Sequence, residues 1–271
     1  MPKTSRRFAA AEAVAPAGYA LRLRPIPELP LSAVRERPPR LQAPSPARLR
    51  SWYDRQPVRR PAVRREYSVG ELSAALEEGL LPGFPALAGP SRELPALPVD
   101  PLLAELGLEA GFGTRTHDLL SRWLGEPGGP PPAADWRGVA PEHRPACQSA
   151  AENLARRFLD SGLGRQAVAA RQREVEVPFV YRWEGAAGPL YLSGQVDLRF
   201  EAEEGVYLVD FKTDRRYREG QYAAQLRLYA LACAQWSERP LLPVVFLLRS
   251  GEALPVRQDW DWPALFAALP R

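Results

Sequence analysis

The feature that most limits what this chain can fold into is a change of hydrophobic period at residue 174. From there, residues 174–183, 190–200 and 206–212 alternate apolar and polar side chains. Glycine-containing turns at Gly185–Gly188 and 203–205 separate the three stretches. Alternation of this kind is typical of strands with one buried face, and short turns join antiparallel neighbours. The sequence therefore predicts a three-stranded meander.

Segments with helical spacing precede and follow the meander. Ser68 and Glu71 form the pattern of a capping box, which predicts a short helix running through Leu80. Further helices are expected at about Thr114–Leu124, near 147–161 with its end at Ser161-Gly162, and over 220–236, and a buried strand at 241–248. Residues 82–98 and the Pro/Gly-rich residues 125–146 are expected to be connectors. The order helix, three strands, helix, strand indicates an α/β fold.

Proline and arginine dominate the N-terminal part of the chain. Many of the 30 prolines precede residue 66, where they block helices and remove ladder donors, so we expect an extended tether over 1–66 and a globular domain over 67–271. Residues 1–65 contain 15 Lys/Arg and 4 Asp/Glu, a balance of +11, which leaves −7 for the remainder of a chain with net charge +4. This positive charge is typical of a segment that binds along a polyanion or an acidic partner. It is equally typical of a linker in which a GC-rich genome encodes many Arg, Pro and Ala residues.

Other features of the composition narrow the class of protein. No apolar run reaches the eighteen residues of a membrane span, and no apolar stretch follows the basic N-terminus as in a secretory signal. A cytoplasmic location without membrane association is therefore expected. The two cysteines, Cys147 and Cys233, cannot supply the four thiolates of a structural zinc site or an iron–sulfur cluster.

The third strand contains the residues that suggest chemistry. Asp210 and Lys212 alternate with Val209 and Phe211, so the carboxylate and the amine share one face of the strand. If the second and third strands pair, Asp197 approaches Asp210 from its neighbouring strand. Two carboxylates repel each other unless a cation lies between them, and Mg²⁺ suits a site with one or two carboxylates. Taken alone, Asp-x-Lys is more typical of an ion pair on an exposed strand face.

The whole string of motifs is more specific than any one of them. It consists of Gly194-Gln195-Val196-Asp197-Leu198, then Asp210-Phe211-Lys212-Thr213-Asp214, then Gln225-xxx-Tyr229. Over about residues 67–250 the chain resembles the PD-(D/E)XK nuclease superfamily, in particular the RecB/AddA-type nuclease domain at the C-terminus of UvrD-like helicase–nucleases. The resemblance implies a restriction-endonuclease-like core with helical additions and an extended N-terminal arm.

The resemblance also implies roles for five residues. Asp197 and Asp210 match the metal-binding acidic residues, and Lys212 matches the catalytic lysine. Gln225 and Tyr229 match the helix motif of this branch, and their spacing of four places them on one helix face turned toward the site.

Two further residues match upstream positions of the family. His117, in Gly113-xxx-His117, resembles the histidine that completes the metal shell. We expect it in the first turn of its helix, where the positive end of the helix dipole disfavours imidazolium. Glu176 resembles the acidic residue that precedes the family's apolar strand, and the sequence leaves its role open.

These matches imply a Mg²⁺-dependent deoxyribonuclease, with Mn²⁺ as a substitute cation. The family implies an exonuclease-type enzyme of DNA recombination and repair, whose partners are DNA and a helicase domain or subunit. The sequence has no GxxxxGK[ST] phosphate loop, so an ATP-driven motor is not expected in it. The sequence is compatible both with a domain excised from a longer protein and with a stand-alone protein. The alternative is a catalytically inactive nuclease-fold module that binds DNA or docks to a helicase.

Deletion of residues 1–65 separates the two interpretations of the basic arm. If the arm binds phosphates, the deletion weakens DNA binding and reduces the slope of log K against log salt by about 0.9 for each phosphate that is no longer neutralised. The measurement is a titration of labelled DNA at several salt concentrations. Affinity and slope that survive the deletion identify the arm as a tether.

Overall fold

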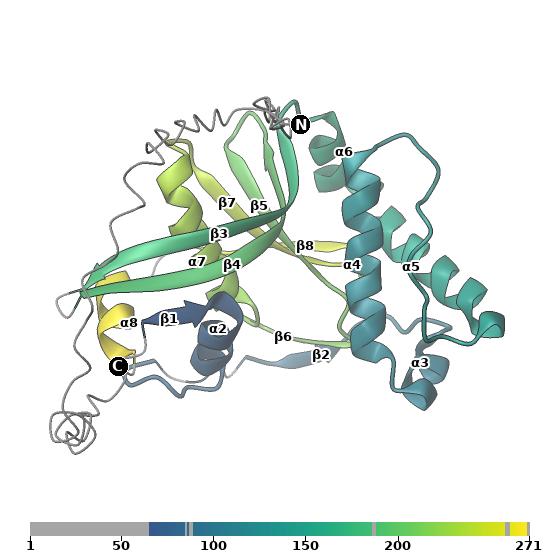
Figure 1. Ribbon diagram of the computed structural model, residues 1–271, viewed down its shortest axis with the longest axis horizontal. Helices are drawn as coiled ribbons and strands as arrows, with labels where there is room; N and C mark the ends of the chain where they lie inside the picture. The colour runs from purple at the N-terminus through teal and green to yellow at the C-terminus, as the bar shows by residue number, and fades with distance from the viewer. Residues whose placement is uncertain (1–64, 85, 87–88, 186–187, 258–260, 270–271) are drawn as a thin grey trace, which may run out of the picture. The chain divides into compact units, whose positions relative to one another are not determined.

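A computed structural model describes residues 65–269, apart from 85, 87–88, 186–187 and 258–260, and these all belong to one unit, Arg60–Arg271 (Figure 1). The extended arm expected over 1–66 lies almost wholly outside the described residues. No helix among the described residues is long and apolar enough to span a membrane.

A mixed six-stranded sheet forms the centre of this unit (Figure 1). Its strands are β1 (Glu66–Ser68), β3 (Arg173–Gly185), β4 (Gly188–Glu201), β5 (Val206–Lys212), β7 (Leu241–Leu247) and β8 (Glu252–Pro255). The order is β1-β4-β5-β7-β8, and β3 pairs with β4 along the other edge of β4. The expected meander is β3, β4 and β5, and the expected buried strand is β7, so these predictions are confirmed, as is the α/β class.

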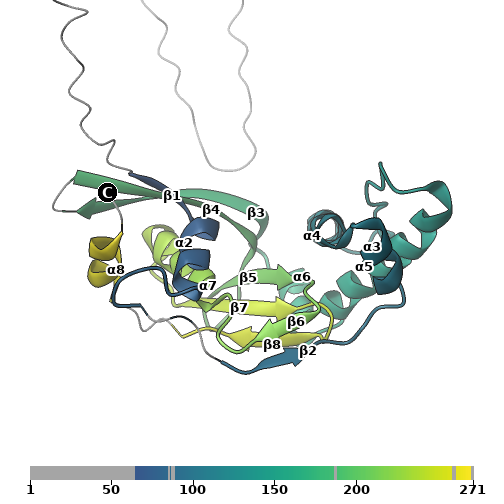
Figure 2. The ribbon, with the colours of Figure 1, turned by 90° about the horizontal axis from the view of Figure 1, so that it is seen from below.

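Helices cover both faces of the sheet (Figure 2). Those of the first core are α2 (Val69–Glu77), α7 (Ala223–Cys233) and α8 (Trp262–Ala268). Those of the second core are α3 (Asp100–Leu106), α4 (Glu109–Gly125), α5 (Arg144–Leu159) and α6 (Gly162–Ala169). Successive residues of β7 point to different cores, with Val245 in the first and Phe246 in the second. Strand β7 is therefore buried on both faces, which explains its nearly continuous apolar run.

The β3–β4 hairpin contributes to both cores. Phe179 and Leu192 pack into the first core, whereas Leu198 and Phe200, farther from the turn, pack into the second. The β3–β4 register does not slip between these two parts. Twist of the long ribbon therefore carries the same face from one core to the other. The change occurs around Asp197, since Val196 still packs into the first core.

Several helix boundaries differ from the sequence expectation. The capping box is present, with Ser68 accepting from the backbone of Glu71, but α2 ends at Glu77 and Leu80 is 67% exposed. The expected end at Ser161-Gly162 is also wrong. Helix α5 ends at Leu159, and the Ser161 side chain caps α6 by accepting from Gly164 N at 2.9 Å. A serine before a glycine served as a start signal here, where we expected a stop.

Two connectors contain regular structure that periodicity did not show. Within 82–98, β2 (Ser91–Glu93) pairs antiparallel with β6 (Arg216–Arg218) to form a separate two-stranded sheet. A 3-10 turn, η2 (Pro141–His143), lies in the proline-rich loop, and another, η3 (Ala234–Trp236), extends α7. Strands of three residues are too short for alternation to be read from sequence.

A buried ion pair joins the start of α3 to the turn after β7. Arg249 and Asp100 are 3% and 4% exposed, and two N–H···O bonds of 2.7 and 2.8 Å join them. Asp100 also accepts from Leu97 N, and Arg249 Nε donates to Thr213 O at 2.7 Å. Burial disfavours the Asp100 carboxylate, but its hydrogen bonds from Arg249 and Leu97 outweigh this and lower its pKa. Through Thr213, the pair anchors the segment that follows β5.

Replacement of Arg249 by leucine is expected to lower the free energy of unfolding by about 3–5 kcal/mol, because Asp100 is left as an uncompensated buried charge. The double variant Asp100→Leu/Arg249→Leu should lose less than the sum of the single variants. Urea unfolding of the four proteins measures the coupling. Additive effects would contradict a stabilising pair.

Candidate active site

Asp197 and Asp210 meet where strands β4 and β5 diverge. Leu198 pairs with Val209 in the β4–β5 ladder, so the next residues along this register are Asp197 and Asp210. At this point a side chain takes the place of the backbone acceptor on β4, because Asp197 Oδ2 accepts from Phe211 N at 2.8 Å. The two aspartates expected to share a site are thus brought to adjacent positions on neighbouring strands.

Lys212 lies beside Asp210, as the alternation of β5 predicted. Its Nζ is 2.8 Å from Asp210 Oδ2 and donates to Gln225 Oε1 at 3.1 Å. Gln225 Nε2 donates to Asp210 Oδ1 at 2.9 Å and is 2.6 Å from the Tyr229 hydroxyl. The ammonium also lies 4.3 Å from the ring centroid of Tyr222, which caps α7 with a φ of 68°. Helix α7 therefore directs its polar face onto the end of β5.

His117 faces the same group from α4. Its Nδ1 lies 3.4 Å from Asp197 Oδ2, so the structure brings it to the expected neighbour. The expected position in a first helical turn is wrong, because α4 begins at Glu109 and His117 is two turns farther along. The helix dipole therefore does not act on the imidazole. Burial is the main cause that lowers the pKa of His117, partly opposed by the charge of Asp210.

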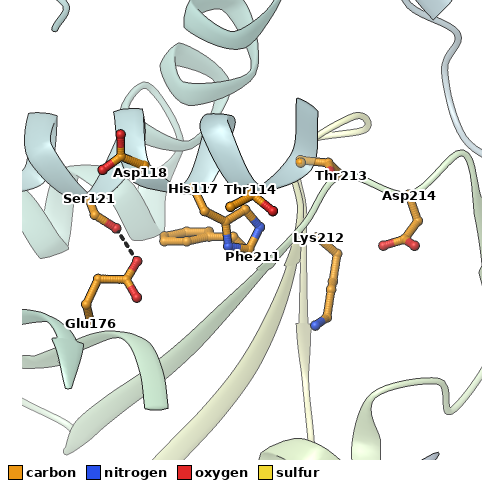
Figure 3. A pocket seen from close by; sticks show the side chains of 10 residues that line it. Thr114, His117, Asp118, Ser121, Glu176, Phe211, Lys212, Thr213 and Asp214 are labelled. Carbon is orange, nitrogen blue, oxygen red and sulfur yellow. Dashed lines mark hydrogen bonds between the residues drawn. The ribbon is translucent and has the colours of Figure 1, made fainter. Parts of the chain in front are cut away.

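A cleft of about 540 Å³ opens beside His117 and Lys212, which line it next to the two aspartates that they contact (Figure 3). Its lining residues are Gly113, Thr114, His117, Asp118, Ser121, Glu176, Phe211, Lys212, Thr213 and Asp214. One wall is α4 and the other is the end of β5. The walls approach closely at Gly113, where a Cβ would lie 2.7 Å from Thr213 Oγ1. The glycine four residues before His117 thus leaves room for the Thr213 hydroxyl, which the Cβ of a larger residue would force to move.

Glu176, on β3, lines a third side of the cleft. The pairs Val175–Leu198 and Val177–Val196 flank it, so it lies opposite Asp197 across the β3–β4 ladder. Three acidic residues therefore occupy neighbouring positions on β3, β4 and β5. The backbone of Glu176 has a φ of 52°, which side-chain-bearing residues rarely adopt. The sequence left this residue open, and its strained backbone is invisible in the sequence.

Sequence reasoning assigned no role to three other residues at the site. Ser121 follows His117 by four residues, so the helical period alone places both on one face of α4. Asp214 directly follows the Lys212-Thr213 motif. Tyr222 gave no signal, because its contact with Lys212 depends on how α7 begins.

Charge is poorly solvated in this site. Burial, and then the charge of Asp210, raise the pKa of Asp197 well above its usual range. Burial opposes the charged form of Lys212, but the nearby Asp210 carboxylate outweighs it and raises the pKa of the amine. The Asp197 side chain is 14% exposed and that of Asp210 is 2% exposed. Acidic groups held this close in a dry environment favour a bound cation.

The donor set suits a divalent cation, although the side chains already have other contacts. Asp210 Oδ2 is buried and, among the described residues, has no hydrogen-bond partner of good geometry, even though Lys212 Nζ is only 2.8 Å away. Carboxylate oxygens with one imidazole are ligands that Mg²⁺ and Mn²⁺ accept. Within the described part of the chain, however, no three His, Cys, Asp or Glu side chains are arranged to hold an ion as they stand. A cation must therefore compete with Phe211 N and Lys212 for oxygens of Asp197 and Asp210.

Comparison with known proteins supports the family read from the motifs. The profile described as the PD-(D/E)XK nuclease superfamily matches residues 93–253, more than half of the chain. One subunit of the ATP-dependent helicase/nuclease from Bacillus licheniformis is 37% identical over 106 residues, covering 31% of this chain and 9% of that protein. The same subunit from Bacillus cereus (strain AH820) is 33% identical over 107 residues, with the same coverage. The chain thus spans about a tenth of the length of these relatives. The crystal structure of SSO0001 superposes with a TM-score of 0.38 at 12% identity, covering 76% of this chain and 73% of that one.

The substitution Asp197→Asn is expected to raise the melting temperature at pH 7 in EDTA. A raised pKa in the folded state means that stability is lost as pH rises from the unfolded pKa, about 3.9, toward the folded value. Asparagine removes this loss and can still accept from Phe211 N. Each kcal/mol gained corresponds to about 2–4 °C in a domain of this size.

Thermal unfolding from pH 4 to 8 measures this effect, and the difference from the unchanged protein should vanish near pH 4. Asp118→Asn is the matched control, because this aspartate lines the same cleft but is 55% exposed and pairs with Arg122. Its effect should stay within about 1 kcal/mol. A stability difference for Asp197→Asn that is constant with pH would refute the electrostatic explanation.

Proposed function

Because this chain belongs to the PD-(D/E)XK nuclease superfamily, we propose that it hydrolyses phosphodiester bonds in DNA with a divalent cation, Mg²⁺ or Mn²⁺. The observation that carries the proposal is the placement of Asp197 beside Asp210 on paired strands, with the Lys212 amine 2.8 Å from Asp210. The family match and the cleft that Lys212 and His117 line support it. The catalytic residues of the proposal are Asp197, Asp210 and Lys212.

Asp197, Asp210 and His117 would hold the cation. When bound, a divalent cation neutralises phosphate charge and lowers the pKa of a coordinated water. The two buried carboxylates supply the negative charge that selects a cation at this point of the cleft. His117 can contribute a lone pair, because burial keeps its imidazole neutral.

Lys212 supplies the positive charge of the protein itself. Its raised pKa keeps the amine protonated at neutral pH, so it can donate to a phosphate oxygen or to the attacking water. Gln225 contacts both Asp210 and Lys212, and Tyr229 contacts Gln225. In the proposal, these two α7 residues fix the direction of the carboxylate and the amine.

The relatives suggest the setting in which the site acts. Their names describe a helicase/nuclease subunit, and this chain matches only about a tenth of their length. We therefore propose that residues 67–271 form an exonuclease-type domain that works beside a helicase domain or subunit in DNA recombination and repair. Residues 1–66 would serve as the tether.

A second candidate is a catalytically inactive nuclease-fold module that binds DNA or docks to a helicase. The arrangement that favours it is the present engagement of Asp197 and Asp210 by Phe211 N and Lys212. Against it, both aspartates, the lysine and the Gln225–Tyr229 pair are all retained. The two candidates differ in whether a cation-dependent product forms.

The variants Asp210→Ala and Lys212→Ala are expected to lower Mg²⁺-dependent cleavage of labelled linear DNA by at least about 10²–10³-fold, since each removes charge from the reacting centre. Circular dichroism should show an unchanged fold. The matched controls are Asp135→Ala and Arg137→Ala, an exposed pair with the same spacing of two. They should cleave at the normal rate.

The outcome also separates the two candidates. Cleavage that disappears in EDTA and returns with Mg²⁺ or Mn²⁺ supports the enzyme. DNA binding without any cation-dependent product would support the inactive module. Normal cleavage by both active-site variants would show that the site lies elsewhere.

A further inference from the structure

The carboxylate of Glu176 is held by two side chains from two other elements. Ser121 Oγ on α4 donates to Oε1 at 2.7 Å, and Gln195 Nε2 on β4 donates to Oε2. Both oxygens of the carboxylate are therefore engaged by neutral donors, one on each side. We name this group of Ser121, Glu176 and Gln195 the Glu176 clasp.

The backbone of Glu176 shows that this arrangement is imposed on the strand. Its φ of 52° is one of only two positive values among the non-glycine residues that the structure describes, the other being Tyr222. Strands do not favour such a conformation, and it persists only where surrounding contacts hold it. The two clasp hydrogen bonds are contacts of this kind. Both positive-φ residues lie at the site, where Tyr222 contacts Lys212.

Ser121 behaves differently from the other hydroxyl residues of α4. The hydroxyls of Thr114 and Thr116 donate to carbonyls of their own helix, at Ala110 and Phe112. That is the common solution for a hydroxyl within a helix. Ser121 is 5% exposed, and its hydroxyl donates across 55 residues of sequence to Glu176 instead. The buried Ser121 hydroxyl therefore donates its hydrogen bond to the Glu176 carboxylate and not to a carbonyl of α4.

The clasp arises from the same elements that carry the proposed cation ligands. Ser121 lies one helical turn after His117 on α4, and Gln195 lies two residues before Asp197 on β4. Each arm therefore shares a face with a proposed ligand. Figure 3 shows Glu176 and Lys212 on opposite sides of His117 in the cleft. The clasp therefore ties Glu176 to the two elements that also carry His117 and Asp197.

We propose that Ser121 and Gln195 are positioning residues for strand cleavage, which act by holding the carboxylate of Glu176 toward the cleft. This inference rests on the proposed nuclease function. Glu176 lies opposite Asp197 and adds a third carboxylate to the site. Without the clasp, the long Glu176 side chain is free to rotate among its rotamers, and the fraction of molecules with the carboxylate in place falls. The loss is expected in kcat, because the two clasp residues act through the Glu176 carboxylate.

A double-mutant cycle tests whether Ser121 acts through Glu176. We expect Ser121→Ala to lower kcat about tenfold at saturating Mg²⁺ and DNA, and Ser121→Thr to stay within about twofold of the unchanged protein. In a Glu176→Ala background, Ser121→Ala should have no further effect, because the group that it positions is gone. Gln195→Leu should behave like Ser121→Ala. Since Gln195 is exposed, this variant tests the same role without changing the packing of the core.

The control for the loss of a buried serine hydroxyl is Ser73→Ala on α2. Ser73 is 6% exposed, and its hydroxyl donates to Gly70 O, away from the cleft. It should leave kcat unchanged. A normal kcat for both Ser121→Ala and Gln195→Leu would overturn the proposal. So would an equal loss from Ser121→Ala in the presence and absence of Glu176, because that result describes a general effect on the fold.

Cleavage by the unchanged protein, measured beside the cycle in kcat and a urea-unfolding cycle, separates this proposal from the proposed function. If the unchanged protein shows no cation-dependent cleavage, the proposed function fails, and the positioning role fails with it even where Ser121 and Glu176 are coupled in stability. If the protein cleaves DNA but Ser121 and Glu176 are uncoupled in kcat, only the positioning role fails. Cleavage with coupling in kcat supports both.

Discussion

The β3–β4 hairpin has to serve two hydrophobic cores, and the candidate site lies where it passes from one to the other. Before this point its inward face contacts α2 and α7, and beyond it the same face contacts α4 and α5. Near the crossing, β4 has left β1 and has only begun to pair with β5. Backbone groups that a continuous ladder would satisfy are left open there, and the Asp197 side chain takes one of them, Phe211 N. The constraint that divides the core thus creates the polar gap.

Charge balance then determines what this gap can hold. Two carboxylates on adjacent strands are costly where water is excluded, and one amine on the same strand offsets part of that cost. Burial and Asp210 together raise the pKa of Asp197, while the same carboxylates raise that of Lys212. A site of this kind is stable in the fold only because the opposite charges are close, and it gains further from any cation that reaches the acids. The packing therefore explains the concentration of negative charge on which the proposed cation site depends.

Much of this arrangement could be predicted from the sequence, because it depends on the period of strands. Alternation put Asp210 and Lys212 on one face, and antiparallel pairing brought Asp197 to them. Helix α4 was harder, since Gly111 and Gly113 near its start weaken the helical signal, and its true start moved His117 out of the first turn. The expected direction of the His117 pKa is the one found, but burial is its main cause. Burial depends on contacts between distant segments, which local patterns do not contain.

The residues that the sequence could not rank are those whose conformation contradicts local preference. Glu176 reads as the polar residue of an alternating strand, yet its positive φ and its contact with α4 set it apart. Ser121 reads as a neutral helix residue, yet its hydroxyl leaves the helix. Local rules and the fold normally agree, and the exceptions gather where function has a competing demand. That both exceptions meet in one hydrogen bond, at the edge of a cleft that also holds Lys212 and His117, is the strongest physical reason to assign that bond a role in the chemistry.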